Sequence, residues 1–281
     1  MTRWGTLFIV ATPLGNLEDL TYRAARVLSE VELVAAEDTR RTRKLMAHLG
    51  LRTKLVSYRE QNHHKILPQV IEVLARGGQV ALVTDAGTPG ISDPGVWLVV
   101  EAARNGAAVA PIPGPSAVIA ALSAAGLPAG SFLFAGYPPV RKKARLAFFE
   151  ELSAQPRTLV FFEAPHRLAE SLSDAALVLG DRPAALCREM TKINEEILRG
   201  RLMDLAEEIH RRQPALKGEI TLVVAGREGA VEKRLSAEEL AGLIKGDHRP
   251  VREIVAELAD CAALSRSELY RLVLRLTGRT S

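Results

Sequence analysis

The sequence predicts an α/β fold made of two α/β domains and a small helical C-terminal module. In the first part of the chain, apolar runs without polar alternation are each followed by a helical pattern, which is typical of a mostly parallel sheet with helices on both faces. Further along, strand candidates outnumber the helices between them, which indicates some antiparallel pairing. The last part is helical and rich in charge. We therefore expect domains over residues 1–114, 115–228 and 229–281.

The first domain is expected to consist of strands that each lead into a helix. Each strand candidate is a short apolar run, and the segment after it has helical spacing. The strands are expected at residues 6–11, 32–37, 54–58, 79–84 and 108–112. The helices after them are expected to begin at Tyr22, Thr39, His64, near Pro94 and at Pro115.

The second domain is expected to have five strands and only three helices between them. Residues 112–128, IPGPSAVIAALSAAGLP, connect it to the first domain. The strands are expected at residues 131–137, 157–165, 184–190, 195–200 and 218–226. The helices of the third part are expected within residues 236–246, 249–262 and 265–279, because each segment begins with a Ser or Pro signal.

The composition excludes several classes of protein. With 47% hydrophobic and 25% charged residues in 281, the chain resembles ordinary soluble globular proteins. Cys187 and Cys261 lie far apart without ligand spacing, and neighbouring His63 and His64 cannot point together at one ion, so we expect no metal site and a cytoplasmic location. The N-terminus is interpreted as a strand and not a signal peptide, and prolines interrupt the uncharged stretch 105–140, so no membrane span is expected.

A Gly- and Pro-rich run, DAGTPGISDPG at residues 85–95, follows the fourth strand candidate. A turn needs fewer residues, and long ordered loops at the carboxyl ends of parallel strands often bind ligands, so we interpret this run as a pocket wall. Two related loops, ATPLGN at 11–16 and IPGPSA at 112–117, follow the first and fifth strand candidates. The sequence has neither GxGxxG after the first strand nor GxxxxGK[ST], which disfavours a dinucleotide site and a P-loop.

Two basic clusters indicate an anionic partner, although the formal net charge is only +4. Each cluster follows a strand end, which favours phosphate contacts over the alternative of a solvated helix face. The first comprises Arg40, Arg41, Arg43 and Lys44, and the second comprises Arg141, Lys142, Lys143 and Arg145.

Together these loops resemble the tetrapyrrole-methylase-fold S-adenosylmethionine (SAM) methyltransferases, and within them the branch that methylates small-subunit ribosomal RNA. The resemblance spans residues 5–226 and departs at residues 58–64, YREQNHH, where relatives read closer to YHEHNE, so that Arg59 replaces a His. It is carried by GTLFIVATPLGNLEDLT, AAEDTRRTRKLM, VTDAGTPGISDPG, PIPGPSAVIAALSAAGLP, GYPP, TLVFFEAPHRL, CREMTKINEE and KGEITLVVAG.

The resemblance implies a two-domain enzyme, usually a homodimer, that binds SAM between its domains and methylates a cytidine ribose 2′-oxygen in 16S rRNA near the decoding site. The SAM-binding residues that it implies are Asp85, Gly87, Thr88, Pro89, Ile91, Ser92, Ser116, Ala117, Phe162, Glu219 and Ile220. On the substrate side we expect Asn16, Asp19, Asp38, Arg40, Arg41, Arg43, Lys142, Lys143, His166 and Arg167.

The candidates for the chemistry are Glu189 and Lys192 in CREMTKINEE. A ribose hydroxyl is a weak acid, so a base or a cation beside its oxygen would accelerate methyl transfer by about 10²–10⁴-fold. Glu189 is a candidate base and Lys192 a candidate oxyanion stabiliser or phosphate contact, while a purely structural ion pair is the alternative. His166 is a second candidate base, with a structural or substrate-positioning role favoured for it.

Two other functions stay open from the sequence. A tetrapyrrole precursor methylase of the same fold also has an anionic substrate, but it needs neither the basic clusters nor the helical module. A non-catalytic RNA-binding assembly protein would use the basic clusters alone, and its Gly-rich loops would be simple turns. SAM binding and the choice of methyl acceptor distinguish the three.

Overall fold

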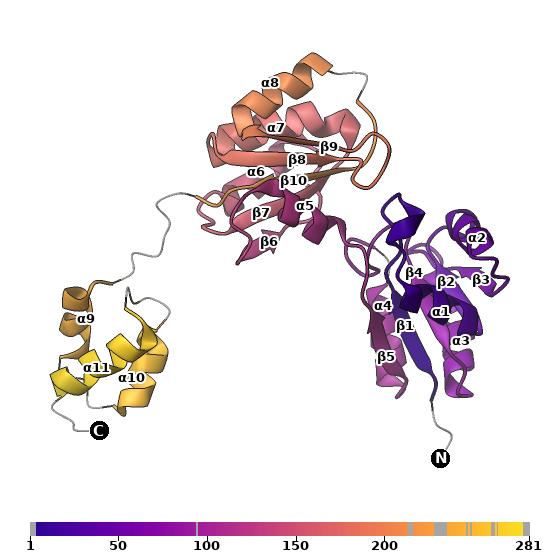
Figure 1. The fold of residues 1–281 in the computed structure, drawn as a ribbon, viewed down its shortest axis with the longest axis horizontal. Helices are drawn as coiled ribbons and strands as arrows, with labels where there is room; N and C mark the ends of the chain where they lie inside the picture. The colour runs from indigo at the N-terminus through magenta and orange to yellow at the C-terminus, as the bar shows by residue number, and fades with distance from the viewer. Residues whose placement is uncertain are drawn as a thin grey trace.

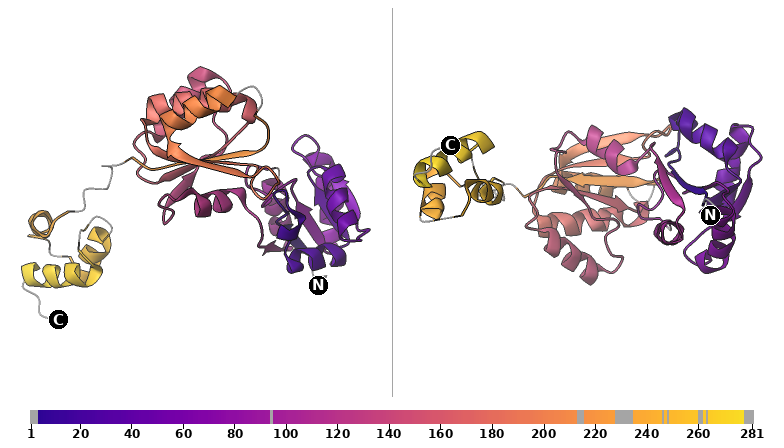
Figure 2. Two further views of the ribbon diagram at one scale, coloured as in Figure 1. Left: turned by 45° about the horizontal axis from the view of Figure 1, so that its top comes forward. Right: turned by 90° about the horizontal axis from the view of Figure 1, so that it is seen from below.

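Figure 1 shows the computed structural model as two α/β bodies followed by a small helical body. The structure describes residues 4–93, 95–212, 216–227, 235–245, 247, 249–259, 262 and 264–277. The three bodies follow one another in chain order, with the second in the middle (Figures 1 and 2). The fold class predicted from the sequence is confirmed, whereas the limits at 114/115 and 228/229 stay a prediction.

The first body is built on a parallel five-stranded sheet. Its strands lie in the order β3-β2-β4-β1-β5, and every neighbouring pair is parallel. All five carboxyl ends therefore lie at one edge, where the Gly-rich loops begin. The strands are β1 (Thr6–Val10), β2 (Leu33–Ala36), β3 (Lys54–Ser57), β4 (Val80–Val83) and β5 (Ala108–Ile112).

Helices cover both faces of this sheet, as the uniformly apolar strands predict. Alternate residues of one strand point to opposite faces. Leu82 of β4 packs in the cluster that includes α3 and α4, and its neighbour Val83 packs in the cluster that includes α1 and α2. The helices are α1 (Tyr22–Glu30), α2 (Thr39–His48), α3 (His63–Ala75) and α4 (Val96–Arg104). The predicted starts at Tyr22 and Thr39 are confirmed, because Thr21 and Asp38 cap these helices with their side chains.

The second body is built on a mixed sheet in the order β6-β7-β10-β8-β9. Only the β6–β7 pair is parallel, and β10 is antiparallel to β7 and β8, which confirms the predicted antiparallel pairing. α5 (Ala117–Ala125) covers one face, and α6 (Lys142–Leu152), α7 (Leu168–Leu179) and α8 (Leu202–Arg212) cover the other. The strands are β6 (Phe132–Phe134), β7 (Thr158–Glu163), β8 (Pro183–Arg188), β9 (Glu196–Arg201) and β10 (Ile220–Val224).

One member of the second basic cluster lies in the interior of this body. Arg145 of α6 is only 1% exposed. Its guanidinium lies 2.7 Å from Asp174 of α7 and also donates to the Val140 carbonyl at 3.0 Å. The expectation that Arg145 contributes to a phosphate-binding cluster is therefore wrong, because a buried carboxylate already neutralises its charge.

The third body has an apolar core of its own. It comprises α9 (Ala237–Ile244), α10 (Val251–Leu258) and α11 (Arg266–Thr277), which pack through residues such as Leu240, Ile254 and Leu269. Ser236 and Glu239 form a capping box at the start of α9, as the Ser start signal predicts. No helix in the described ranges is both long and apolar enough to cross a membrane. Cys261 lies outside the described residues, and Cys187 is buried as a free thiol.

Candidate functional site

A cavity of about 360 Å³ lies where the carboxyl edge of the first sheet faces the second body. This volume falls in the range of small-molecule sites. The first body contributes the segments after β2 and β4, and the second contributes α5 and the ends of β7 and β10. The lining residues are Leu14, Glu37, residues 84–88, residues 91–93, residues 116–118, Tyr137, residues 162–165, Met190 and residues 218–221. We call it the cofactor cavity.

Three loops interlock to form the wall of the cofactor cavity. Gly87 and Thr12 exchange two backbone hydrogen bonds of 2.9 Å, which join the loop after β4 to the loop after β1. Thr88 Oγ1 donates to the Pro115 carbonyl at 3.1 Å, which adds the loop after β5. Gly87 has a φ of +83°, in the left-handed region that glycine adopts without steric cost. The Gly-rich run is thus a fixed wall, as its interpretation from the sequence predicts.

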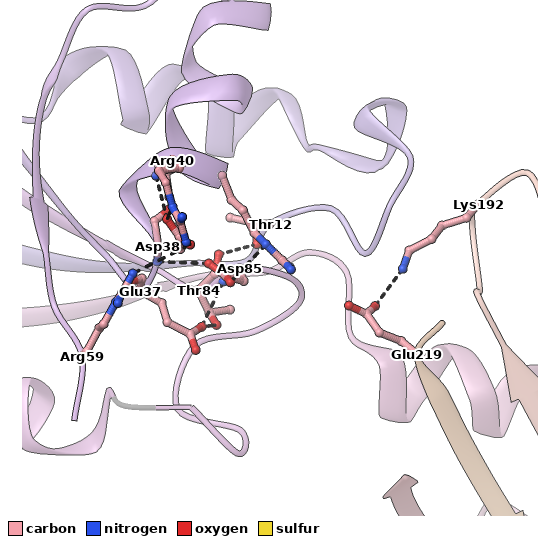
Figure 3. A network of polar contacts seen from close by, with 11 residues as sticks. Thr12, Glu37, Asp38, Arg40, Arg59, Thr84, Asp85, Lys192 and Glu219 are labelled. Atoms are coloured by element: carbon pink, nitrogen blue, oxygen red, sulfur yellow. Dashed lines mark hydrogen bonds and ion pairs between the residues drawn. The ribbon is translucent and has the colours of Figure 1, made fainter. Parts of the chain in front are cut away.

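Three carboxylates gather at the first-sheet side of the cavity. Thr84 Oγ1 donates to Glu37 at 2.6 Å, and the Asp85 N–H donates to the same oxygen at 3.2 Å (Figure 3). Burial raises the pKa of Asp93 to about 6. A hydrogen bond from Thr84 acts to lower this pKa, whereas the negative charges of Glu37 and Asp85 raise it further. Burial and Glu37 also raise the pKa of Asp85. This side of the cavity therefore favours a cationic ligand.

Aromatic side chains from the second body also line the cofactor cavity. The rings of Tyr137 and Phe162 lie 5.5 Å apart between centroids, and Phe134 packs edge-on against Phe162 at 4.8 Å. Burial is the main reason why the pKa of Tyr137 is raised. Such a surface suits a flat aromatic group. The cavity thus combines an aromatic side with an anionic side.

A second hollow, of about 230 Å³, adjoins the cofactor cavity. The two share Leu14, Thr84, Asp85, Ala86 and Glu219 in their linings, so these residues form a common wall. The second hollow also has three cationic side chains, Arg41 and Lys44 from α2 and Lys192 from the turn between β8 and β9. We call it the cationic hollow. Its three cations outnumber the two carboxylates of the lining, Asp85 and Glu219, so it suits an anionic group placed next to whatever the cofactor cavity holds.

Two carboxylates hold Lys192, and one of them, Glu219, belongs to the common wall. Its Nζ donates to Glu189 at 2.8 Å and to Glu219 at 3.0 Å, and Figure 3 shows the second of these bonds. Burial acts to lower the pKa of Lys192, but the bonds to both carboxylates outweigh it and the pKa is raised. The ammonium group is therefore charged at neutral pH.

Glu189 lies behind Lys192 and lines neither hollow. Burial acts to raise its pKa, but hydrogen bonds from Lys192 and from the Glu219 N–H outweigh it and the pKa is lowered. Two glycines leave room for this arrangement, because a Cβ on Gly218 would overlap the Glu189 side chain and a Cβ on Gly15 would overlap that of Lys192. Glu189 is thus an ionised carboxylate that orients a lysine.

The structure brings most of the implied SAM-binding residues together. Pro89 is the one that does not line the cofactor cavity, and Glu219 also binds Lys192. Sequence reasoning missed Glu37, Thr84 and Asp93, although Thr84 and Glu37 end strand segments that were correctly predicted. The lining residues among those implied are Asp85, Gly87, Thr88, Ile91, Ser92, Ser116, Ala117, Phe162, Glu219 and Ile220.

The first-body substrate candidates lie around the cationic hollow, although only Arg41 lines it. Arg41 also lies 3.4 Å from Asp85. Asn16 donates its backbone N–H to Thr191 at 3.2 Å, which links the first body to the turn that carries Lys192. Asp38 caps α2 and binds Arg40 at 2.6 Å (Figure 3). Asp19 ends a short 3-10 helix, and Arg43 is exposed on α2.

The second-body substrate candidates lie outside both linings. Arg167 is largely buried and binds Glu163 at 2.6 Å, so a carboxylate within the second body neutralises its charge. His166 belongs to the same 3-10 helix, Pro165–Arg167. Lys142 and Lys143 are exposed at the start of α6, where Lys142 lies 3.9 Å from Asp174. Within the described ranges, no group of three or more His, Cys, Asp or Glu side chains is arranged to hold a metal ion.

Comparison with known proteins places this chain in a family. Residues 6–206 match the family described as Tetrapyrrole (Corrin/Porphyrin) Methylases. The chain is 50% identical over 229 residues to the ribosomal RNA small subunit methyltransferase I of Halalkalibacterium halodurans, covering 81% of this chain and 78% of that protein. It is 42% identical to the protein of the same name from Xylella fastidiosa, covering 96% of this chain and 99% of that protein.

Solved structures show the same architecture. A uroporphyrin-III-C-methyltransferase from Thermus thermophilus is 26% identical, with a TM-score of 0.54 over 79% of this chain and 92% of that chain. A structure of a uroporphyrin-III C-methyl transferase from Thermus thermophilus complexed with S-adenyl homocysteine is 20% identical over 79% of this chain and 97% of that chain, with a TM-score of 0.55, and shows the fold alone. The chain thus belongs to the tetrapyrrole (corrin/porphyrin) methylase family, within the group of ribosomal RNA small subunit methyltransferase I proteins.

Proposed function

We propose that the chain uses SAM to methylate the ribose 2′-oxygen of a cytidine in 16S rRNA near the decoding site. The names of its relatives support ribosomal RNA as the substrate, and the sequence resemblance supports the cytidine ribose. The observation that carries the proposal is the wall shared by the cofactor cavity and the cationic hollow. A methyl donor in the first and a nucleotide in the second would meet at this wall.

The residues of the cofactor cavity fit SAM. SAM has an aromatic adenine, a cationic sulfonium and an amino-acid end, and when bound it supplies an electrophilic methyl group. The aromatic side, with Tyr137 and Phe162, suits the adenine. The anionic side, with Glu37, Asp85 and Asp93, suits the positive charges. The interlocked loops hold these groups in place before binding, which lowers the ordering cost of binding.

The cationic hollow fits the acceptor nucleotide. Arg41 and Lys44 suit the RNA phosphates, because their charges would replace the condensed counterions. Lys192 lines the cationic hollow and binds Glu219 of the shared wall, so it would stabilise the negative charge that develops on a ribose oxygen placed there. Glu189 and Glu219 would fix the ammonium group for this task, so Glu189 acts here as a positioning residue and not as the base, and the proton of the 2′-hydroxyl would pass to solvent water. Alignment of the two reactants in the adjoining hollows would lower the activation barrier further, by up to roughly 7–11 kcal/mol.

The proposal extends to the assembly and location of the enzyme. We propose a homodimer, as the resemblance implies, and exposed apolar side chains near the cavity, Ile91, Val96 and Trp97, support a protein contact there. The substrate would place the enzyme in the cytoplasm. The domain limits at 114/115 and 228/229 belong to the proposal too, with SAM held between the first two domains.

A tetrapyrrole precursor is the second candidate substrate. The 26% identity to a uroporphyrin-III-C-methyltransferase favours it, and the cationic hollow would also accept the carboxylates of such a molecule. The higher identity to the ribosomal RNA small subunit methyltransferase I proteins favours RNA.

The test is a methyl-transfer assay with radiolabelled SAM and three acceptors: 30S subunits, free 16S rRNA and uroporphyrinogen III. We expect label in RNA from at least one ribosomal acceptor and none in uroporphyrinogen. Label in uroporphyrinogen alone would establish the tetrapyrrole activity. If calorimetry detects no SAM binding at millimolar concentration, the remaining alternative is a non-catalytic RNA-binding assembly protein.

A further inference from the structure

The helical C-terminal body presents a concave surface that neither hollow of the catalytic site uses. The surface lies between α10 and α11 and encloses about 650 Å³. Its lining residues are Arg252 and Val255 from α10 and Arg266, Ser267, Tyr270 and Arg271 from α11. We call it the arginine surface. Three of its six residues are cationic and none is acidic.

Three acidic residues of the helical body are engaged in local contacts. Asp247 and Glu257 bind Arg249 at 2.8 and 2.6 Å. Glu268, one turn before Arg271, accepts hydrogen bonds from the backbone and side chain of Ser265 at 2.8 and 2.5 Å. In the described part of the chain, Arg252, Arg266 and Arg271 form no ion pair with any of these carboxylates. The hydrogen bonds from Ser265 lower the pKa of Glu268, and the charge of Arg271 adds to this effect only at longer range. Without a direct ion pair to these carboxylates, the three guanidinium groups are available to an external anion.

The packing of the body fixes where these arginines point. Val255 of α10 and Leu269 and Val273 of α11 are buried in the core that joins the helices. Arg266 and Tyr270 are one helical turn apart on α11, and Arg271 follows directly. Tyr270 keeps 37% of its surface exposed beside the arginines. Cations around an exposed aromatic ring are a combination that nucleic-acid-binding surfaces use for phosphates and for stacking of a base or sugar.

We propose that the arginine surface binds the phosphate backbone of the substrate RNA, at a place separate from the target nucleotide. This inference rests on the proposed function, which makes RNA the substrate. Figures 1 and 2 show the C-terminal body on the far side of the second body from the first, so the surface would hold RNA that extends beyond the catalytic cleft. It would raise RNA affinity without taking part in methyl transfer.

The test is the double variant Arg266→Gln/Arg271→Gln in the full-length protein. Binding to free 16S rRNA is measured across a salt series. We expect affinity to fall by on the order of tenfold and the slope of log affinity against log salt to fall by about 1.4–1.8, since each lost phosphate contact removes about 0.7–0.9. SAM affinity and the methyl-transfer rate at saturating RNA should stay unchanged.

The matched control is Lys245→Gln/Arg275→Gln, which removes two exposed charges from the same body outside the arginine surface. Thermal unfolding shows whether both variants stay folded. Unchanged affinity and slope in the folded test variant would overturn the inference, as would an equal loss in the control. A loss confined to 30S subunits, with free 16S rRNA bound normally, would instead assign the surface to an acidic ribosomal protein.

These outcomes are distinct from failure of the proposed function. The methyl-transfer assay on the unsubstituted enzyme tests the function, and it does not depend on the arginine surface. An enzyme that methylates 16S rRNA but binds it equally well without Arg266 and Arg271 would retain the function and lose this inference.

Discussion

Removal of the Lys192 ammonium should slow methyl transfer with little effect on binding. Lys192→Ala removes the cation that binds Glu189 and Glu219, and it leaves the Glu219 carboxylate at the wall where negative charge would develop on the ribose oxygen. A unit charge about 4 Å from that oxygen is worth at most about 4 kcal/mol at an effective dielectric constant of 20. Because the Lys192 side chain is 26% exposed, solvent screens part of this energy, and we expect the lower end of the roughly 2.7–4 kcal/mol that the loss of one oxyanion donor costs, which is a rate loss of about 10²-fold.

The assay is single-turnover methyl transfer at saturating RNA and SAM, together with separate titrations of each ligand. We expect the rate of the chemical step to fall while both affinities change less than about threefold, because the lost interaction belongs to the transition state. The matched control is Lys217→Ala, which removes an exposed lysine two residues before Glu219 and should keep the full rate. A full single-turnover rate in Lys192→Ala would refute the catalytic role. A fall in RNA affinity with normal chemistry would make Lys192 a phosphate contact.

Two further variants separate the roles at this wall. Lys192→Arg keeps the charge, but a guanidinium does not fit the narrow place over Gly15, so we expect it to recover only part of the rate. Glu189→Gln removes the carboxylate that orients the lysine, and we expect a smaller loss than in Lys192→Ala with no change in the shape of the pH–rate profile. A larger loss, with the acidic limb of that profile abolished, would identify Glu189 as the general base instead.

The remaining predictions concern the cofactor cavity, the core and the basic cluster. Gly87→Val should abolish SAM binding in calorimetry while the protein stays folded, because a β-branched residue is strained at a φ of +83°; unchanged affinity would disprove the assignment of this loop. Asp93 has a pKa of about 6, so SAM affinity should decrease as the pH falls through 6, and Asp93→Asn should remove this dependence; a dependence that persists would exclude Asp93 as its source. Because this pKa is raised on folding, Asp93 opposes stability above pH 6, and Asp93→Asn should raise the denaturant midpoint there but not at pH 4. Arg145→Ala should lower the free energy of unfolding by about 3–5 kcal/mol by leaving a buried carboxylate unpaired, and a loss below 1 kcal/mol would show that the pair is dispensable. Lys142→Gln/Lys143→Gln should reduce RNA affinity and its salt dependence, and an unaltered slope would make this pair a solvated helix face.

Most of the fold could be predicted because its signals are local. The strands of the first sheet are buried on both faces, so their sequences are continuously apolar, and Thr21 and Asp38 mark helix starts by their capping chemistry. Antiparallel pairing in the second sheet followed from the shortage of helices between its strands. The Gly- and Pro-rich run after Val83 predicted the cavity wall, because it is longer than a turn needs and lies at the carboxyl end of a parallel strand.

The parts that sequence reasoning missed depend on contacts between distant segments. Glu37 and Asp93 meet around Thr84 only after β2 and β4 pair, and no spacing in the sequence reveals this. Arg145 looked like a surface charge because its partner Asp174 lies 29 residues further along the chain. No pattern in the sequence indicates that Glu37, Asp93 and Arg145, rather than other polar residues, become partly or fully buried in the fold.

The most direct test of the central claim is mass-spectrometric mapping of 16S rRNA from cells with and without this protein. We expect that one cytidine near the decoding site carries a ribose 2′-O-methyl group only when the protein is present, and that the Lys192→Ala variant fails to restore it. An identical set of 16S rRNA modifications in both cells would contradict the proposal that this chain methylates ribosomal RNA.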